Sequence, residues 1–332
     1  MIFKQLFDNK SSTYTYIISS GKGREALIID PVIEHTKKYL NLLKELDLKL
    51  VKVIDTHIHA DHISGLNELA KQTSCSKIMG EHSASEVVDI RVKDNEKIKI
   101  ESIELTSIYT PGHTDCSYSF LMKDRVFTGD TLLIKGTGRT DFQNGDARDA
   151  YNSIFNVLLK LPEDTKVYPA HDYKGETVST IGEEKKLNPR LQVKSVDEYV
   201  NIMNNLNLPN PKMMDIAVPG NLSLGISLEK QKLSNGLEKK DFLKKIKDQN
   251  SLLIDLREKQ EIEKDGKIEG GLEIPFTDIN EYIKNNKQDL SNKNLLFYCR
   301  VGHRSALAVQ ISKNYNLENS HHLIGGMKNL NL

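Results

Sequence analysis

The chain has 332 residues, which is long enough for two domains of ordinary size. Its 46 Lys and Arg residues balance 46 Asp and Glu residues, so no global charge favours nucleic acid or an anionic membrane as a partner. The three separated cysteines, Cys75, Cys116 and Cys299, are typical of a reducing compartment and not of a disulfide framework. No apolar run has the form of a signal peptide or approaches the roughly 18 residues of a membrane span. We therefore expect a cytoplasmic protein.

Short β-rich runs and helical patterns alternate along the first two hundred residues. Runs rich in β-branched and aromatic residues predict strands over 13–19, 26–30, 52–55, 103–109, 117–122, 125–128 and 166–168. Apolar residues at helical spacing predict helices over 35–46, 63–72 and 147–161. This alternation predicts an α/β sandwich with its sheets inside.

A change of composition separates this region from the rest of the chain. Residues 209–236 are rich in Asn, Pro, Gly and Ser, as expected of a tail that leads from one domain to another. We place the boundary at about 225 to 237, which predicts domains 1–225 and 237–332. In the second domain the sequence predicts a helix over 241–247, strands over 251–255 and 295–298, and a helix that opens after Cys299, which together form a small α/β unit.

The segment THIHADH, residues 56–62, follows a predicted buried strand and contains three histidines and a carboxylate. In extended backbone, side chains two apart point the same way, so His57 and His59 can face one point in space. Asp61 and His62 reach past that point once the chain turns. Because imidazole is the commonest metal ligand in proteins, this spacing predicts a site for one or two metal ions.

Three later segments supply further metal-binding groups, each directly after a predicted strand. They are PGH, which ends at His113, GD, which ends at Asp130, and PAH, which ends at His171. A single histidine or aspartate at such a turn is usually structural. Together with THIHADH and in this order, the three segments are specific for a metal centre.

The order THIHADH, PGH, GD and AHD resembles the metallo-β-lactamase superfamily over residues 1 to about 220. The resemblance implies an αββα sandwich with metals at the sheet ends. It also implies seven ligand positions, namely His57, His59 and His113 for a first metal, Asp61, His62 and His171 for a second, and Asp130 shared between them. A full ligand set of this kind is typical of a hydrolase with two Zn ions, such as a glyoxalase II.

Other segments resemble a different branch of the superfamily, the persulfide dioxygenases. These segments are DTLLIKGTGRTDFQ at 130–143, HDYKG at 171–175 and the run NPRLQVKSVDEYVNIMNNLNLPNPKMMDIAVPGN that starts at 188. The resemblance implies one Fe(II) per chain, held by His57, His113 and Asp130. Two histidines and one carboxylate leave three positions open, enough for O₂ and a persulfide sulfur together.

The same resemblance implies roles for the remaining polar groups. Four residues would orient the metal ligands without binding the iron themselves: His59, Asp61, His62 and His171. Arg139 and Tyr173 would line the persulfide pocket. Arg139 has the forked geometry that suits a carboxylate of the carrier thiol.

The segment CRVGHRS, residues 299–305, follows the apolar strand LLFY and precedes a helix. Cys299 would lie beneath backbone N–H groups and a helix N-terminus, with Arg300 and Arg304 near, so we expect a lowered pKa and a populated thiolate. The segment resembles the active loop of rhodaneses, and SLLIDLRE, GKIEGGLEIP and LIGGM resemble the rest of a single rhodanese domain. Four residues separate Cys299 from Arg304, one fewer than in the related phosphatase loop, which favours sulfur transfer. The resemblance implies that Cys299, Arg300 and Arg304 are catalytic.

The sequence therefore predicts a persulfide dioxygenase fused to a rhodanese. The first domain would oxidise a thiol persulfide, such as glutathione persulfide, with O₂ to sulfite and the free thiol. The second would carry sulfane sulfur on Cys299 between thiosulfate, sulfite and thiols, in a direction that the sequence leaves open. The alternatives are a glyoxalase II-like thioester hydrolase with two Zn and an accessory rhodanese domain, and a redox sensor in which Cys299 only signals. We expect small-molecule partners, with a homodimer as the assembly to be tested.

Overall fold

The computed structural model describes residues 1–85, 88–208, 213–223, 234–257 and 259–330. The chain divides into two compact units, Met1–Pro211 and Lys212–Leu332. The boundary predicted at 225 to 237 lies largely outside the described residues. Within the described ranges, every helix is too short or too polar to span a bilayer.

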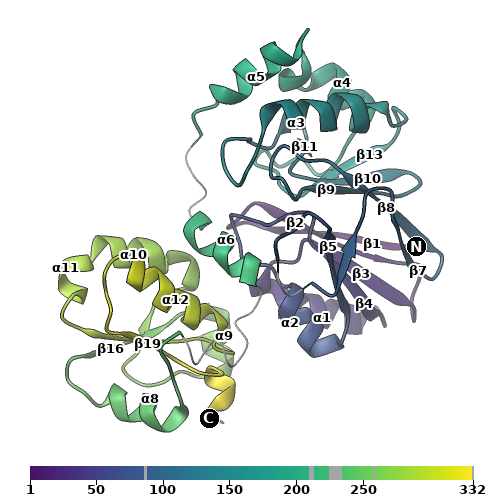
Figure 1. Ribbon diagram of the computed structural model, residues 1–332. Coiled ribbons are helices and arrows are strands. Elements are labelled where there is room, and N and C mark those ends of the chain that lie inside the picture. The colour runs from purple at the N-terminus through teal and green to yellow at the C-terminus, as the bar shows by residue number, and fades with distance from the viewer. Residues whose placement is uncertain (86–87, 209–212, 224–233, 258, 331–332) are drawn as a thin grey trace. The chain divides into compact units, whose positions relative to one another are not determined.

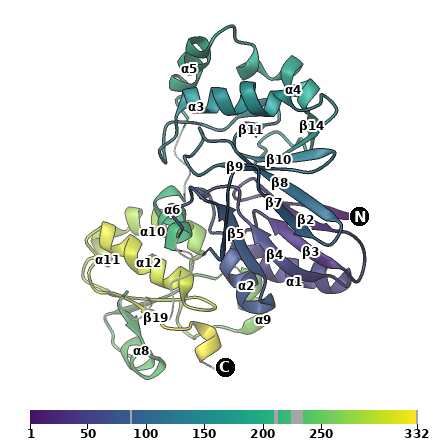
Figure 2. The same cartoon turned by 45° about the vertical axis from the view of Figure 1, so that its right-hand side comes forward.

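The first unit is an αββα sandwich of two six-stranded sheets, as Figures 1 and 2 show. The first sheet runs from β1 to β6 in sequence order and is formed by Ile2–Asp8, Thr13–Ser19, Glu25–Ile29, Lys49–Ile54, Ser76–Gly80 and Ile90–Val92. The second sheet has the order β14-β13-β10-β9-β8-β7. In chain order from β7, its strands are Lys97–Ile100, Ile103–Tyr109, Tyr118–Leu121, Arg125–Gly129, Lys166–Pro169 and Ser179–Thr180. A separate hairpin joins β11 (Leu132–Leu133) to β12 (Gly136–Thr137).

The main hydrophobic core lies between these sheets. Phe120 of β9 and Phe127 of β10 are 0% and 1% exposed, and they belong to one cluster with Tyr16 of β2 and Leu27 of β3. Burying a side chain of this size contributes about 1.5–3 kcal/mol. All seven residues of β2 are buried, which explains why its sequence, TYTYIIS, contains no charged residue. This core holds the two sheets so that their loops meet at one end.

Helices cover the outer face of each sheet (Figures 1 and 2). On the first sheet they are α1 (Thr36–Glu45) and α2 (Leu66–Thr73), and on the second they are α3 (Ala147–Tyr151), α4 (Ile181–Leu187) and α5 (Val196–Asn204). The Asp146 side chain begins α3 by accepting hydrogen bonds from the N–H groups of Arg148 and Asp149. The helix predicted over 147–161 continues past α3 as a π-helical segment, Asn152–Val157, and a 3₁₀ turn, Leu158–Lys160.

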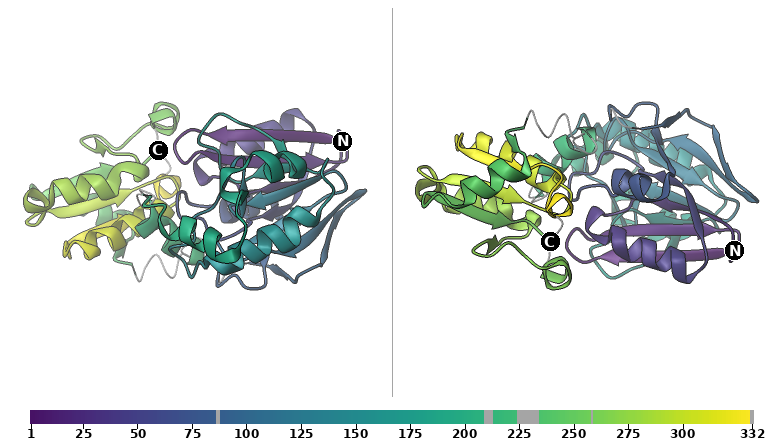
Figure 3. Two further views of the ribbon diagram at one scale, coloured as in Figure 1. Left: turned by 90° about the horizontal axis from the view of Figure 1, so that it is seen from above. Right: turned by 90° about the horizontal axis from the view of Figure 1, so that it is seen from below.

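The second unit is built on a five-stranded sheet in which every neighbouring pair is parallel. Its order is β15-β19-β18-β16-β17, formed by Gly236–Leu237, Ser320–Leu323, Asn294–Tyr298, Ser251–Asp255 and Leu272–Glu273. Figures 1 and 3 show helices flanking this sheet. They include α8 (Lys239–Ile246) on one side and α10 (Ile279–Asn285), α11 (Lys287–Leu290) and α12 (His303–Asn314) on the other. The unit also contains α6 (Met214–Ser223) and α9 (Lys259–Asp265). The predicted α/β class is confirmed for both units.

Candidate metal centre and sulfur-transfer loop

The predicted metal ligands lie in loops that follow four strands. The segment THIHADH follows β4, His113 follows β8, Asp130 comes directly after β10, and His171 comes after β13. In the second sheet, β10 pairs in parallel with β13 and antiparallel with β9, which is itself antiparallel to β8. The carboxyl ends of β8, β10 and β13 therefore meet at the same edge of the sheet.

Three of these residues form a compact buried group. His57, His113 and Asp130 are 1%, 5% and 8% exposed, and their ligand atoms lie within 4.8 Å of one another. Nε2 of His113 is 3.6 Å from Oδ2 of Asp130, and the imidazole rings of His57 and His113 stand nearly perpendicular with centroids 5.0 Å apart. The predicted set of two histidines and one carboxylate is thus assembled in the fold.

Hydrogen bonds orient both histidines of this group. Nδ1 of His113 is 2.8 Å from the carbonyl oxygen of Arg139, which can only accept, so the proton of His113 lies on Nδ1. Nδ1 of His57 is 2.9 Å from Oγ1 of Thr56, whose hydroxyl donates to Oδ2 of Asp30 at 3.0 Å. Because that hydroxyl has one proton, it accepts from Nδ1–H of His57. Both rings therefore keep Nε2 available for a metal ion.

Asp30 also belongs to the site, although it lies outside the four motifs that identified the candidate ligands. It directly follows β3, has the left-handed conformation with φ 50°, and is 1% exposed. Its Oδ1 accepts the N–H of Thr56 at 2.7 Å and the Nε2–H of His59 at 3.1 Å. His59 thus turns its Nε2 toward Asp30, and burial lowers the pKa of its imidazole. The available signal in the sequence was a carboxylate, Asp30, at the end of the predicted strand 26–30, since that strand pairs with the one before THIHADH.

Two glycines let the ligand loops pack closely. Gly129 has φ 53°, and a side chain there would lie 2.9 Å from Oγ1 of Thr56. At Gly138, a Cβ atom would lie 2.1 Å from the carbonyl oxygen of Asp130 and 2.9 Å from Nδ1 of His113. The backbone of the segment GTGRTDFQ therefore passes directly over the ligands, as its glycines require.

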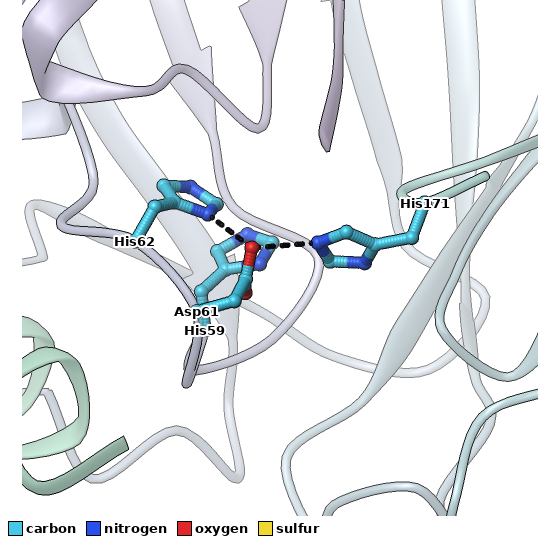
Figure 4. A group of neighbouring side chains, drawn as sticks. All are labelled: His59, Asp61, His62 and His171. Atoms are coloured by element: carbon cyan, nitrogen blue, oxygen red, sulfur yellow. Dashed lines mark hydrogen bonds and ion pairs between the residues drawn. The ribbon is translucent and has the colours of Figure 1, made fainter. Parts of the chain in front are cut away.

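A second group is formed by the four other predicted site residues. One ligand atom of each lies within 4.8 Å of those of the others, and the residues are His59, Asp61, His62 and His171 (Figure 4). Oδ2 of Asp61 is 2.8 Å from Nε2 of His171 and 3.1 Å from Nδ1 of His62, and it also accepts the hydroxyl of Thr13 at 3.0 Å. These contacts give Asp61 three hydrogen-bond partners. The group also has the composition of a second metal site, as the zinc alternative requires.

His171 joins the two groups. Its Nδ1 is 2.6 Å from Oδ1 of Asp130 while its Nε2 contacts Asp61. Burial alone would lower the pKa of His171, but the carboxylates of Asp130 and Asp61 outweigh it and raise that pKa well above its usual value. Burial likewise opposes ionisation of Asp130, yet His171, His113 and His57 hold its pKa below the usual range. A histidine held in this way orients Oδ2 of Asp130 toward His113.

The two predicted substrate residues lie beside these groups. The backbone carbonyl of Arg139 accepts the Nδ1–H of His113, and its guanidinium is already paired in a fork with Asp141 at 2.6 and 2.7 Å. Tyr173 is 70% exposed, and its ring is stacked on His171 with centroids 6.1 Å apart. A cavity of about 520 Å³ opens between Tyr173 and the β1–β2 hairpin.

The sulfur-transfer loop occupies the end of β18 in the second unit. Cys299 is 1% exposed, and its Sγ accepts the N–H of Gly302 at 3.2 Å and lies 3.6 Å from Oγ of Ser305. Gly302 has φ 91° and precedes α12, so its N–H group can point into the loop. The backbone of the LIGGM segment closes the loop from the other side, because a Cβ atom on Gly326 would lie 2.4 Å from the Cys299 carbonyl oxygen.

The two predicted arginines of this loop have different environments. Arg304 is 8% exposed and forms a two-point ion pair with Glu261 of α9, with both N···O distances 2.8 Å. Arg300 is half-buried, and its guanidinium has no ion-pair partner in the part of the chain that the structure describes. The loop thus brings together Cys299 and both arginines, with one of the two charges neutralised by a carboxylate.

Fold and site together define a metallo-β-lactamase-type unit with a candidate metal centre, joined to a rhodanese-type unit. Residues 9–171 match the Metallo-beta-lactamase superfamily, and residues 238–331 match the Rhodanese-like domain. The metallo-beta-lactamase structure from Staphylococcus aureus subsp. aureus COL has a TM-score of 0.64 at 23% identity and covers 97% of this chain and 98% of its own, which shows a shared fold.

Higher identities are found for the first unit. The mitochondrial persulfide dioxygenase ETHE1 of Mus musculus is 42% identical over 229 residues, which cover 68% of this chain and 89% of that protein. The crystal structure of ETHE1 from Myxococcus xanthus is 48% identical with a TM-score of 0.66, and the match covers 67% of this chain and 99% of the other. The chain belongs to the persulfide dioxygenase family of the metallo-β-lactamase superfamily and extends it by a rhodanese domain.

Proposed function

We propose that the first unit is a persulfide dioxygenase with one Fe(II), held by Nε2 of His57, Nε2 of His113 and Oδ2 of Asp130. The observation that supports this most is the direction of the hydrogen bonds around these atoms. Thr56 and the Arg139 carbonyl accept the Nδ1 protons of the two histidines, while His171 takes Oδ1 of Asp130. Two imidazoles and one carboxylate are the donor set that suits non-haem Fe(II).

The proposed reaction converts RSSH, O₂ and H₂O into RSH, sulfite and two protons. The outer sulfur is oxidised by O₂, its bond to the carrier sulfur breaks, and the carrier leaves as the thiol. Bound Fe(II) would supply the one-electron chemistry with O₂. The chain's own residues hold the ligand atoms and keep them from rotating, because each ligand has a second hydrogen-bond partner.

The carrier thiol is proposed to be a small thiol such as glutathione. Tyr173, which is exposed and stacks on the buried ring of His171, would contact the carrier thiol next to the 520 Å³ cavity. Arg139 would bind a carboxylate of the carrier by exchanging its fork from Asp141 to the ligand. This exchange predicts that Arg139→Ala raises the KM for glutathione persulfide more than it lowers kcat.

For the second unit we propose sulfur transfer through Cys299. A Cys299 thiolate would attack the sulfane sulfur of a donor, forming a cysteine persulfide and releasing thiol or sulfite with the electron pair of the broken S–S bond. The N–H of Gly302 and the N-terminus of α12 would stabilise the terminal sulfur anion. Sulfur carried in this way would feed the first unit or form thiosulfate from its sulfite.

Metal content and O₂ uptake test the first proposal. Protein purified without oxygen should contain about one iron per chain, consume O₂ with glutathione persulfide and release sulfite. His113→Ala should lose both the iron and the activity. Asp61→Asn should retain close to one metal per chain, because Asp61 is proposed to orient His171 and not to bind iron.

The second group of side chains supports one rival function, a thioester hydrolase with two Zn. In that case Asp61→Asn would lower the metal content from two zinc ions to one and abolish hydrolysis of S-D-lactoylglutathione. Two zinc ions with thioester hydrolysis and no O₂ uptake would refute the dioxygenase. We also propose a cytoplasmic location, which cell fractionation tests, and a homodimer, which light scattering tests.

A further inference from the structure

The ion pair between Arg304 and Glu261 changes the charge that a sulfur donor meets at the loop. Arg304 is the last residue of the CRVGHR loop and lies in the first turn of α12. Its guanidinium binds both carboxylate oxygens of Glu261 at 2.8 Å, in the fork geometry that makes such pairs strong and directional. The two side chains are only 9% and 20% exposed, so water screens the pair weakly.

This ion pair reduces the net positive charge of the loop that contains Cys299. Arg304 and Glu261 sum to zero, which leaves the side chain of Arg300 as the loop's net positive charge beside the partial charge of the α12 N-terminus. Without Glu261, the same loop would present two full positive charges. The Glu261 carboxylate therefore decides whether the loop has one or two net positive charges. It comes from α9, outside the loop motif.

Sulfur donors differ in the charge that they bring to such a site. Thiosulfate is a dianion, and its attack by the Cys299 thiolate releases sulfite with two negative charges. The persulfide group of a thiol persulfide is neutral or singly charged at the reacting sulfurs, and the same attack releases a sulfur with one negative charge, the thiolate. In both cases one S–S bond breaks and one S–S bond forms, and the leaving group takes the electron pair. A site with fewer positive charges discriminates against the dianion.

We infer that Glu261 is a specificity-determining residue that neutralises Arg304 and thereby selects thiol persulfides over thiosulfate as the sulfur donor. The inference rests on the proposed transfer through Cys299 and adds the class of donor to it. It assigns Arg304 a positioning role, in which the ion pair to α9 holds the loop. Arg300 becomes the group that meets the donor's charge.

A charge cycle on the full-length protein tests the inference. For each variant, kcat/KM is measured with thiosulfate and with glutathione persulfide, and the ratio of the two is compared, so that a loss of folded protein cancels. Glu261→Gln should raise the ratio of kcat/KM for thiosulfate to kcat/KM for glutathione persulfide roughly tenfold, because it removes one unit of negative charge from a partly buried ion pair of the loop. Arg304→Gln should lower this ratio, since it removes the positive charge that offsets the Glu261 carboxylate.

The double variant Glu261→Gln with Arg304→Gln restores the neutral sum and should return the ratio to the value of the unmodified protein. Glu263→Gln is the matched control, because it removes another carboxylate from α9. The Glu263 carboxylate is exposed and lies 4.0 Å from Nζ of Lys259. This control should leave the ratio unchanged. A purely structural role for the ion pair predicts equal losses with both donors in all three ion-pair variants, and that outcome would overturn the inference.

Failure of the proposed transfer itself has a different signature. If Cys299→Ser keeps full transfer with both donors, the catalytic role of Cys299 is wrong, whatever the ratios show. If Cys299→Ser abolishes transfer while Glu261→Gln leaves the ratio unchanged, sulfur transfer stands and the charge selection by Glu261 is rejected.

Discussion

The hydroxyl of Thr56 connects the buried carboxylate of Asp30 to the proposed metal ligand His57, and its removal has a testable consequence. Thr56→Val keeps the shape of the side chain but removes the bridge between Oδ2 of Asp30 and Nδ1 of His57, which spans 3.0 and 2.9 Å. Asp30 and His57 are each 1% exposed, so water does not replace the lost hydroxyl. We expect a loss of about 1–3 kcal/mol in the free energy of unfolding, the usual cost of an unpaired buried polar group.

The same change should weaken metal binding. Groups that orient a ligating histidine typically contribute 10- to 100-fold to metal affinity, or about 1.4–2.7 kcal/mol. The assay is a chelator competition with Co(II), which avoids oxidation of the metal, on protein freed of metal. We expect Thr56→Val to raise the Kd for the ion by at least about tenfold.

Thr110→Val is the matched control for this experiment. Thr110 is 0% exposed, and its hydroxyl pairs with those of Ser119 at 2.9 Å and Thr131 at 3.3 Å, so the change also removes buried hydrogen bonds, but neither partner is a proposed metal ligand. It should reduce stability to a similar extent and leave the Kd for Co(II) unchanged. Equal metal affinity of Thr56→Val and the unmodified protein would refute the hydrogen-bond chain that we describe through Asp30, Thr56 and His57.

Three further predictions concern separate parts of the molecule. Cys299→Ser should abolish sulfur transfer and leave O₂ uptake unchanged, whereas parallel loss of both activities would contradict independent sites. Phe120→Ala should lower the free energy of unfolding in urea by about 3–5 kcal/mol, and a loss below about 1 kcal/mol would contradict its place in the core. His35 and Ser11 hold the pKa of Asp8 below its usual value although burial opposes them. Asp8 therefore stabilises the fold above about pH 4 and less as pH falls, so the deficit of Asp8→Asn should shrink in acid; a deficit independent of pH would contradict this.

Strands with strong local patterns were predictable from the sequence alone. The strands at Thr13–Ser19, Ile103–Tyr109 and Ser251–Asp255 have the predicted bounds, because long runs of β-branched and aromatic residues favour a buried strand in any context. The edge strand β1 and the short strand β5 were not predicted. Their sequences, IFKQLFD and SKIMG, mix charged and apolar residues, and only pairing with a neighbour makes them strands.

The candidate metal ligands were also predictable, because each follows a strand and strand ends converge at one edge of a sheet. The sequence does not show which atom of each ligand is available. For His57 that depends on Asp30, which lies 26 residues from Thr56 and reaches it because β3 and β4 pair in parallel with Ile29 beside Ile54.

In the second unit, too, the sequence predicts the chemical groups and the tertiary structure decides their partners. The motif CRVGHRS by itself determined the candidate nucleophile, the loop length and the two arginines, because these are properties of adjacent residues. Only the tertiary structure decided that Arg304 is paired with Glu261, 43 residues away on another helix. Local sequence determines which chemical groups the chain has at its strand ends, and packing between distant elements determines their charge and orientation, because those depend on partners that folding brings together.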